Sequence, residues 1–312
     1  MCDYARVDLT YLQAVVIGLL QGVTELFPIS SLGHSILVPA WIGGEWQSLV
    51  TQGDSSGHTP FLAFVVALHV ATALALIVFY WRDWVAVIRG FFWSLSHRSL
   101  GRSEARLAWL LIIGTIPVGV IGLLLEKPLR VLFSTPLVAA VFLTLNGLVL
   151  LTAELLRRRQ TILAGRAARA AGSRAEARGV AARRIDDLSL GEGALIGTTQ
   201  ALALLPGISR SGVTISAGLL RRLDHESAAR FAFMLATPVI LAAGVLKVPD
   251  LLQPDARGIM GQVIVGSICA FVAAFAAVAF LSRYFHTRTL YPFVIYCVVV
   301  GVASIIRFGF FG

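Results

Sequence analysis

The chain has 312 residues, of which 57% are hydrophobic and only 14% charged, and its mean hydropathy is +0.81. Soluble domains carry about 25% charged residues, so this composition excludes a soluble enzyme and predicts a protein embedded in a membrane. The net charge of +9 would favour nucleic acid as the partner of a soluble protein, but in a membrane protein Lys and Arg mainly fix the orientation. We therefore expect no nucleic-acid partner.

The first apolar stretch, about residues 9–42, is interrupted in its middle by Phe27-Pro28-Ile29-Ser30-Ser31. A membrane span needs roughly 20 apolar residues. Irregular backbone at membrane depth is tolerated only where it is buried in protein or lines a water-filled cavity. We therefore predict that this stretch is a re-entrant helix–loop–helix element and not a span.

Polar residues gather at this first break. Gln21 and Glu25 are four positions apart, so they share one face of a helix. If a second helix begins near Ser30, then Ser31 and His34 share a face as well. A polar group in an apolar segment costs several kcal/mol unless it is paired, so these residues are candidates for function.

Three windows that read as full spans follow, at about 61–81, 107–125 and 136–156. The first contains a lone imidazole, His69, which we interpret as a packing residue. The segment 157–187 is rich in Arg, Ala and Gly, and we expect it to be a solvated linker. Its positive charge is typical of a cytoplasmic loop that sets topology, and less typical of a nucleic-acid site.

A second broken stretch covers about residues 192–220, with its break at Leu205-Pro206-Gly207-Ile208-Ser209. A Gly-containing turn that opens a helix presents free backbone N–H groups and the positive end of the helix dipole, which together bind anions. Arg210 adds a permanent charge with a forked geometry suited to phosphate. The hydroxyl groups that could contact the same phosphate are those of Ser209, Ser211 and Thr214. Ser30 and Ser209 could equally be helix N-caps.

Three further spans are predicted at about 229–248, 260–282 and 290–311. The two broken stretches resemble each other, because a shift of 179 positions superimposes five identical residues. The matching residues are Gly18, Gln21, Ile29, Ser30 and Gly33 in the first stretch, and Gly197, Gln200, Ile208, Ser209 and Gly212 in the second. Each stretch is followed by three spans, an odd number, so the second copy is expected to be inverted in the membrane.

The predicted fold is therefore an all-α polytopic membrane protein with six transmembrane helices, two re-entrant elements and an inverted repeat. We expect one membrane domain over residues 1–312, with repeat 1 at about 9–156, a cytoplasmic basic linker at about 157–191 and repeat 2 at about 192–311. Nineteen Lys and Arg residues fall in the loops on one side of this arrangement and five in those on the other. This asymmetry places the first set of loops in the cytoplasm and both termini outside.

The motifs from Gln21 to His34 and from Pro206 to Thr214 resemble the two signatures of the undecaprenyl-diphosphatase (bacitracin resistance) family. The resemblance extends to the span that begins near Phe61 and to Gly114-Thr115-Ile116-Pro117, so it covers nearly the whole chain. It implies hydrolysis of undecaprenyl diphosphate to the monophosphate in a bacterial cell membrane, which recycles the lipid carrier of peptidoglycan synthesis and confers resistance to bacitracin. It also implies a site that opens to the extracytoplasmic side and a requirement for Mg²⁺ or Ca²⁺.

The resemblance also implies roles for particular residues. The expected catalytic residues are Glu25, Ser31, His34 and Arg210, with Glu25 also as metal ligand. Phosphate binding is expected from Ser30, Ser209, Arg210, Ser211 and Thr214. One position departs from the family pattern, because Gln21 stands where the pattern has a Glu, and Gln is a weaker metal ligand than a carboxylate.

Several alternatives stay open from the sequence. The nucleophile is Ser31, His34 or water, with His34 as general base or acid. A carrier that flips polyprenyl phosphates without hydrolysing them is the rival function, because inverted repeats are typical of transporters. Phosphatases of the phosphatidic-acid type are disfavoured, since the chain lacks their Lys-(x6)-Arg-Pro and Pro-Ser-Gly-His motifs. The expected partners are the lipid substrate and membrane lipids, and a homodimer is kept open.

Overall fold

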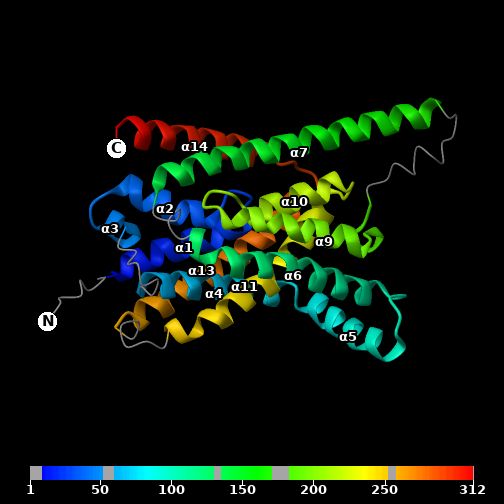
Figure 1. The fold of residues 1–312 in the computed structure, drawn as a ribbon, viewed down its shortest axis with the longest axis horizontal. Coiled ribbons are helices and arrows are strands. Elements are labelled where there is room, and N and C mark those ends of the chain that lie inside the picture. Colours follow the sequence, from blue (N-terminus) through cyan, green and yellow to red (C-terminus); the bar gives the residue numbers. More distant parts are fainter. Residues whose placement is uncertain (1–8, 52–59, 130–134, 171–182, 252–257, 312) are drawn as a thin grey trace.

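The structure is a computed structural model that describes residues 9–51, 60–129, 135–170, 183–251 and 258–311. Helices dominate these ranges, which contain no strand, as predicted (Figure 1). The elements in chain order are α1 (Tyr11–Leu26), α2 (Ser31–Ile42), α3 (Glu45–Thr51), α4 (Pro60–Phe79), α5 (Trp81–His97), α6 (Ser103–Leu129), α7 (Pro136–Ala170), η2 (Ile185–Asp187), α9 (Leu190–Thr199), η3 (Gln200–Leu204), α10 (Arg210–Leu220), α11 (His225–Leu251), α13 (Met260–Tyr284) and α14 (Tyr291–Phe310).

Five of the described helices are long and apolar enough to cross a membrane, and they lie in α6, α7, α11, α13 and α14. The predicted span at 61–81 corresponds to α4, which qualifies only when it is joined to α5. These two helices meet at an angle of 83°. The described part therefore contains five or six candidate spans, in agreement with a multi-pass membrane protein.

Both broken stretches fold as pairs of short helices around an irregular turn. Thr10 and Gln13 form a capping box that starts α1, and Ser189 and Glu192 form one that starts α9. The chain leaves α1 at Phe27, before Pro28, and begins α2 with Ser30 as N-cap. It leaves η3 at Leu205 and begins α10 with Ser209 as N-cap. The helix start that the sequence predicts near Ser30 is confirmed.

The two breaks lie directly against each other. A Cβ atom added at Gly33 would be 2.9 Å from the Cα atom of Gly207. Gly207 itself has a φ of 108°, which L side chains rarely adopt, and an added Cβ would lie 2.4 Å from the carbonyl oxygen of Ala139 in α7. Glycine at this position therefore allows the second turn to approach α7 and the start of α2.

Small residues also bring α1 close to α13. An added Cβ at Gly18 would lie 2.4 Å from the carbonyl oxygen of Gly266, and one at Gly22 would lie 2.3 Å from that of Ala270. Such contacts between small residues are the usual way in which helices approach closely inside a membrane. The first broken element is thus held against a candidate span along its length.

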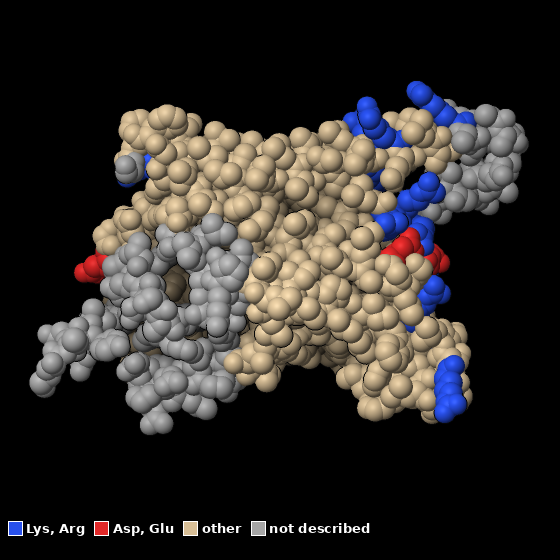
Figure 2. All heavy atoms as spheres, viewed as in Figure 1, with Lys and Arg blue, Asp and Glu red and all other residues tan. Residues whose placement is uncertain are grey.

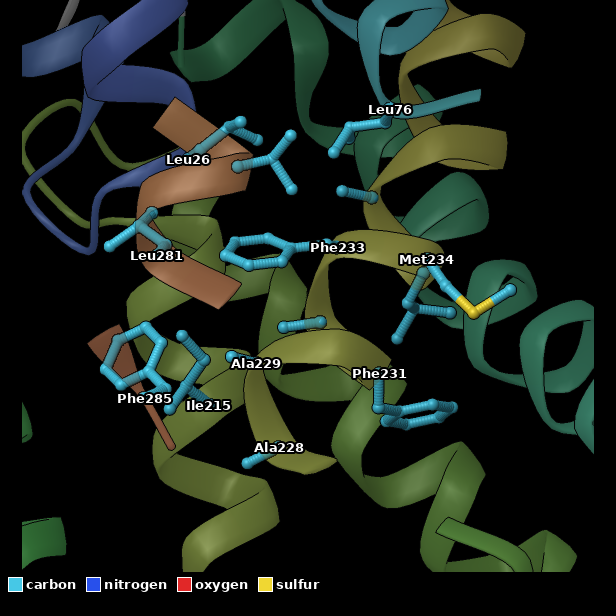
Figure 3. Packing of buried hydrophobic residues seen from close by; sticks show 14 of the residues in the cluster. Leu26, Leu76, Ile215, Ala228, Ala229, Phe231, Phe233, Met234, Leu281 and Phe285 are labelled. Carbon is cyan, nitrogen blue, oxygen red and sulfur yellow. The ribbon is translucent and has the colours of Figure 1, made fainter. Parts of the chain in front are cut away.

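The hydrophobic core surrounds α11 (Figure 3). Phe233 of α11 is buried together with Leu26 of α1, Leu76 of α4 and Leu281 of α13, which come from segments far apart in the chain. Ile215 places α10 in the same cluster. Packing around α11 therefore fixes α1 and α10, the two helices that carry the break residues.

The basic loops lie at one end of the molecule. On the face shown in Figure 2, Lys and Arg gather where α7 ends and α9 begins. The linker predicted over residues 157–187 is helical up to Ala170, because α7 continues that far, and its residues 171–182 lie outside the described ranges. Arg, Leu, Gln and Ala favour helix, and they fill this extension. Between the predicted spans at 61–81 and 107–125, the chain forms the amphipathic helix α5.

Candidate active site

Glu25 is the centre of a polar cluster at the end of α1. Its side chain is buried, and its Oε1 atom is paired with the guanidinium of Arg210. Its Oε2 atom accepts a hydrogen bond from Ser31 Oγ at 2.5 Å and one from Gln21 Nε2 at 3.0 Å. His69 Nε2 lies 3.3 Å from the same oxygen. Four groups of the protein therefore contact this carboxylate, three of them at Oε2 and one at Oε1.

Arg210 connects the second break to this cluster. It is the first residue of α10, and its guanidinium reaches Glu25 with one nitrogen and the carbonyl oxygen of Ala236 with another, at 3.3 Å. The ion pair therefore joins α1, α10 and α11. Three of the four predicted catalytic residues, Glu25, Ser31 and Arg210, meet at one point.

His34, the fourth predicted catalytic residue, has other partners. Its Nδ1 atom lies 2.7 Å from the carbonyl oxygen of Ser30, so Nδ1 carries the hydrogen and donates it. Its Nε2 atom lies 2.7 Å from the hydroxyl of Tyr296 in α14. The two rings also stack. His34 is thus held between the first break and α14, and its hydrogen-bond partners among the described residues do not include Ser31.

The predicted phosphate-binding hydroxyls are engaged with the protein. Ser30 and Ser209 both act as N-caps, accepting from the N–H groups of Gly33 and Gly212, each at 3.1 Å. The remaining two bond to the backbone or to a neighbour: Ser211 Oγ donates to Phe27 O at 3.2 Å and lies 3.0 Å from Ser209 Oγ, and Thr214 Oγ1 donates to Arg210 O at 2.8 Å. Ser30 thus caps α2, and the hydroxyls of Ser209, Ser211 and Thr214 bond at the start of α10. The positive end of the α10 dipole lies at this start, beside Arg210.

Asn146 of α7 was not singled out from the sequence, although it joins the two breaks. Its Nδ2 donates to the carbonyl oxygen of Pro28 at 2.9 Å, and its Oδ1 accepts from the N–H of Ser209 at 3.0 Å. The side chain is fully buried. An amide inside an apolar span is itself the signal that could have identified it, because such a group must find partners.

The interpretation of His69 as a packing residue is wrong, since its ring contacts the central carboxylate. The Glu25 side chain is 5% exposed and that of His69 is 27% exposed, so the imidazole lies on the more open side of the cluster. The position of His69 within an apolar span could have indicated a functional role, because ionisable groups at membrane depth usually serve a function. The sequence could not show that His69 faces Glu25, since α4 and α1 are brought together only by the fold.

A divalent cation would find few ligands at this cluster. Mg²⁺ and Ca²⁺ prefer carboxylate and carbonyl oxygens, but both oxygens of Glu25 already face donor or cationic groups. Gln21 turns its amide nitrogen toward Glu25, and its Oε1 is buried without a hydrogen-bond partner. No group of three or more His, Cys, Asp or Glu side chains suited to a metal occurs in the described ranges. The residues present therefore do not fit a cation held by the protein alone.

Known proteins resemble this chain over almost its whole length. A family model described as bacitracin resistance protein BacA matches residues 14–303. An undecaprenyl-diphosphatase of Mycolicibacterium paratuberculosis is 55% identical over 298 residues, which cover 96% of this chain and 97% of the relative. One from Mycobacterium avium is 54% identical over 299 residues, with coverage of 96% and 97%. An undecaprenyl-diphosphatase of Frankia alni is 52% identical over 339 residues, with coverage of 96% and 98%.

Proposed function

This chain belongs to the BacA family of bacitracin resistance proteins, and from that membership together with the Glu25–Arg210 cluster we propose that it hydrolyses undecaprenyl diphosphate. The products are undecaprenyl phosphate and inorganic phosphate. The chain is accordingly a hydrolase of the membrane, and its reaction returns the lipid carrier to cell-wall synthesis.

The observation that carries the proposal is the meeting of Glu25, Ser31 and Arg210 from two separate breaks. Phosphoryl transfer requires neutralised phosphate charge and a nucleophile in line with the bond that breaks, and little covalent chemistry from the protein. Arg210, at the positive end of the α10 dipole, supplies a forked donor for phosphate oxygens. Glu25 holds this guanidinium in place before the substrate arrives, which is the preorganisation that such sites need.

We assign the role of nucleophile to Ser31. Its hydroxyl donates to Glu25 at 2.5 Å, so the carboxylate is the group placed to accept its proton. As Ser31 Oγ bonds to the terminal phosphorus, its proton passes to Glu25 and the bond to the bridging oxygen breaks, so the lipid monophosphate leaves with that oxygen. Water then attacks the phosphoserine, which releases inorganic phosphate and returns a hydrogen to Ser31 Oγ. A phosphoserine at Ser31, trapped by acid quench and found by mass spectrometry, is the expected result. Normal turnover in Ser31→Ala would instead assign the attack to water.

A divalent cation, which the family resemblance implies, would supply further neutralisation of the diphosphate charge. The roles of Arg210, Glu25 and Ser31 do not require it to be bound by the protein beforehand. The residues assigned to the proposed site all come from one chain. The required partners are the lipid substrate and the surrounding membrane lipids.

The proposal includes an arrangement in the bacterial cell membrane. Six spans, with α4 as the first, would enclose two re-entrant elements, α1–α2 and α9–α10, in an inverted repeat. The excess of Lys and Arg at the end where α7 stops supports a cytoplasmic position for that end, and the site then opens to the outside. Cysteines at Arg98 and Glu45, in a chain without its native cysteines, should be labelled from the inside and from the outside, respectively. Labelling of both from one side contradicts this topology.

The experiment that tests the function is phosphate release from undecaprenyl diphosphate by the purified protein in detergent, with and without EDTA. Hydrolysis that depends on Arg210 is the expected result. A folded protein that releases no phosphate but moves the lipid between leaflets of vesicles would instead be a carrier.

A further inference from the structure

A groove of about 500 Å³ lies beside the end of α13 and the turn that follows this helix. One part of its wall is apolar and is formed by Ala276, Ala279 and Phe280. Another part carries the guanidinium groups of Arg283 and Arg288. None of these residues belongs to the proposed active site, so the groove has no role in the reaction described above.

Hydrogen bonds within the turn hold both arginines at the groove. The carbonyl oxygen of Tyr284, the last residue of α13, accepts from the N–H groups of Thr287 at 3.3 Å and of Arg288 at 3.0 Å. The hydroxyl of Tyr284 donates to the carbonyl oxygen of Thr289 at 3.0 Å. The chain is thus folded back on the helix end, and Arg288 lies at the same groove as Arg283.

The positive charge of the groove is not neutralised by the protein. Within the described part of the chain, neither guanidinium group of the groove has a carboxylate partner, and both side chains are exposed. By contrast, Arg183 and Arg230, which lie in the same set of basic loops, each contact a carboxylate. Arginine is always protonated in proteins, so the groove presents a charge of about +2 to an occupant.

The groove lies where a membrane span ends. Its apolar part belongs to the candidate span Met260–Tyr284, which has no Asp, Glu, Lys or Arg before Arg283. Tyrosine is enriched at the boundary between membrane and water, which is the position of Tyr284 at the end of this span. The helix rises about 10 Å from Ala276 to Arg283. A fitting occupant is therefore an amphiphile whose negative group lies about that far from an apolar chain.

We propose that this groove binds an anionic phospholipid of the bilayer, with its phosphate between Arg283 and Arg288 and the start of an acyl chain along Ala276 and Ala279. Basic pockets beside membrane helices on the cytoplasmic side are suited to such headgroups. The forked donors of arginine match phosphate oxygens. The proposal goes beyond the hydrolase function, and it takes from the proposed membrane arrangement only the leaflet, which is the cytoplasmic one.

A lipid in this groove would also cover a residue that packs on the first break. The ring of Phe280 stacks on that of Phe27, with centroids 5.9 Å apart and planes 3° from parallel. The carbonyl oxygen of Phe27 in turn accepts from Ser211 Oγ of the second break at 3.2 Å. A ligand that binds only the folded protein raises its unfolding temperature. We therefore expect an anionic phospholipid to protect the protein against heat.

The test is a titration of the full chain, purified in a neutral detergent, with dioleoyl phosphatidylglycerol or dioleoyl phosphatidylcholine, followed by native mass spectrometry. Wild type should bind the anionic lipid at least about tenfold more tightly, since each arginine near a lipid surface favours negative charge. In the double variant Arg283→Gln with Arg288→Gln, the two affinities should agree within about twofold. The matched control is Arg158→Gln with Arg159→Gln, at exposed positions of α7, which removes the same charge and should keep the preference.

The apolar wall is tested without any change of charge. Ala276→Phe fills the groove and should weaken phosphatidylglycerol binding about fivefold or more, because the acyl chain loses its place beside the helix. Its control is Ile268→Phe, an exposed position two turns earlier in α13 that does not line the groove. This pair also tests the proposal if the double arginine variant does not fold. Thermal unfolding with and without phosphatidylglycerol should show protection in wild type and in both controls, and little in the groove variants.

Several results would overturn the proposal. They are equal binding of both lipids by wild type, a preference that survives in the folded double arginine variant, or an equal loss in the Arg158 and Arg159 control. Unchanged binding in Ala276→Phe has the same meaning. Displacement of phosphatidylglycerol by millimolar inorganic phosphate would reduce the groove to an anion site. Tighter binding of undecaprenyl phosphate that depends on the two arginines would assign the groove to the polyprenyl lipid instead. None of these measurements uses turnover, so a protein that releases no phosphate would contradict only the proposed function.

Discussion

The first and second breaks share several residues and the way their helices are capped, yet they carry different polar side chains. A shift of 179 positions relates the two capping boxes, Thr10–Gln13 and Ser189–Glu192, and the two N-caps, Ser30 and Ser209. It also relates two hydroxyls that donate back to the first residue of their helix, Ser35 to Ser31 at 3.0 Å and Thr214 to Arg210 at 2.8 Å. The scaffold is thus present twice.

The differences lie at the positions that meet in the site. Glu25 of the first break corresponds to Leu204 of the second, and Ser31 corresponds to Arg210. Both first helical residues, Ser31 and Arg210, bond to the same carboxylate. In the proposed mechanism, the helix start of the first break therefore provides the nucleophile and the corresponding helix start of the second break provides the phosphate clamp. Neither copy contains a complete site by itself.

The largest expected effect follows from the one carboxylate that both breaks share. Glu25→Gln keeps the size of the side chain but removes the charge that orients Arg210 and accepts from Ser31. We expect turnover to fall by about 10³ or more, as for groups that act as a unit. Phosphate release by folded protein measures it. The matched control is Glu192→Gln, at the start of α9, which should retain normal turnover.

Removal of the clamp from the second break should have the next largest effect. Arg210→Ala should lower turnover by about 10² to 10³, the loss typical of a preorganised charged donor. Arg210→Lys keeps the charge but loses the fork, so it should recover only part of the activity. Phosphate release by the two folded variants measures both effects. Normal turnover in Arg210→Ala would contradict the clamp, and normal turnover in Arg210→Lys would show that the fork is not needed.

The contact between the breaks can be weakened without touching the site residues. Asn146→Ala leaves the N–H of Ser209 buried without its partner and leaves the carbonyl of Pro28 with only the Cys297 thiol, at 3.8 Å, so it should lower the free energy of unfolding by about 1–3 kcal/mol. Thermal unfolding in detergent measures the change. Thr152→Ala, at an exposed position of the same helix, is the control and should shift the unfolding temperature little.

The sequence predicts those features of the fold and site that neighbouring residues determine, and it does not predict contacts between residues that are far apart in the chain. The breaks, the caps and the candidates Glu25, Ser31 and Arg210 are local, since Pro, Gly and polar residues interrupt apolar runs. The pairing of Glu25 with Arg210 is not local, because the two lie in different repeats. The contacts of His69 and Asn146 were not predicted because their partners lie on other segments of the chain. The sequence around a single polar residue in a span does not show which residue it contacts.

The N-caps offer a smaller test with opposite signs at the two breaks. Ser30 has a φ of 71°, which costs a non-glycine residue free energy, whereas Ser209 has a φ of −90°. A Gly cap loses only a few tenths of a kcal/mol relative to Ser. Ser30→Gly should therefore be neutral or stabilising by up to about 1 kcal/mol, because Gly removes the strain. Ser209→Gly should be slightly destabilising, and equal shifts in unfolding temperature would contradict the comparison.

The smallest effect concerns the capping boxes. In α9 the box contains a carboxylate, and a bidentate contact with Arg183 lowers the pKa of Glu192 to about 2 from the ordinary 4.5. Its stabilising contribution is therefore present above pH 4.5 and is lost as the pH falls toward 2. The equivalent box in α1 uses the neutral Gln13 and should not respond. Over that range Glu192→Gln should show a weaker loss of stability than wild type in thermal unfolding.

The central claim is that one site is divided between two breaks and joined through Glu25 and Arg210. A double-variant cycle of phosphate release tests it most directly, using Glu25→Gln, Arg210→Ala and the combination under single-turnover conditions. Groups that act as one unit give non-additive losses, so the combined variant should be no slower than the slower single variant. Losses that multiply would show two independent contributions and would contradict the account.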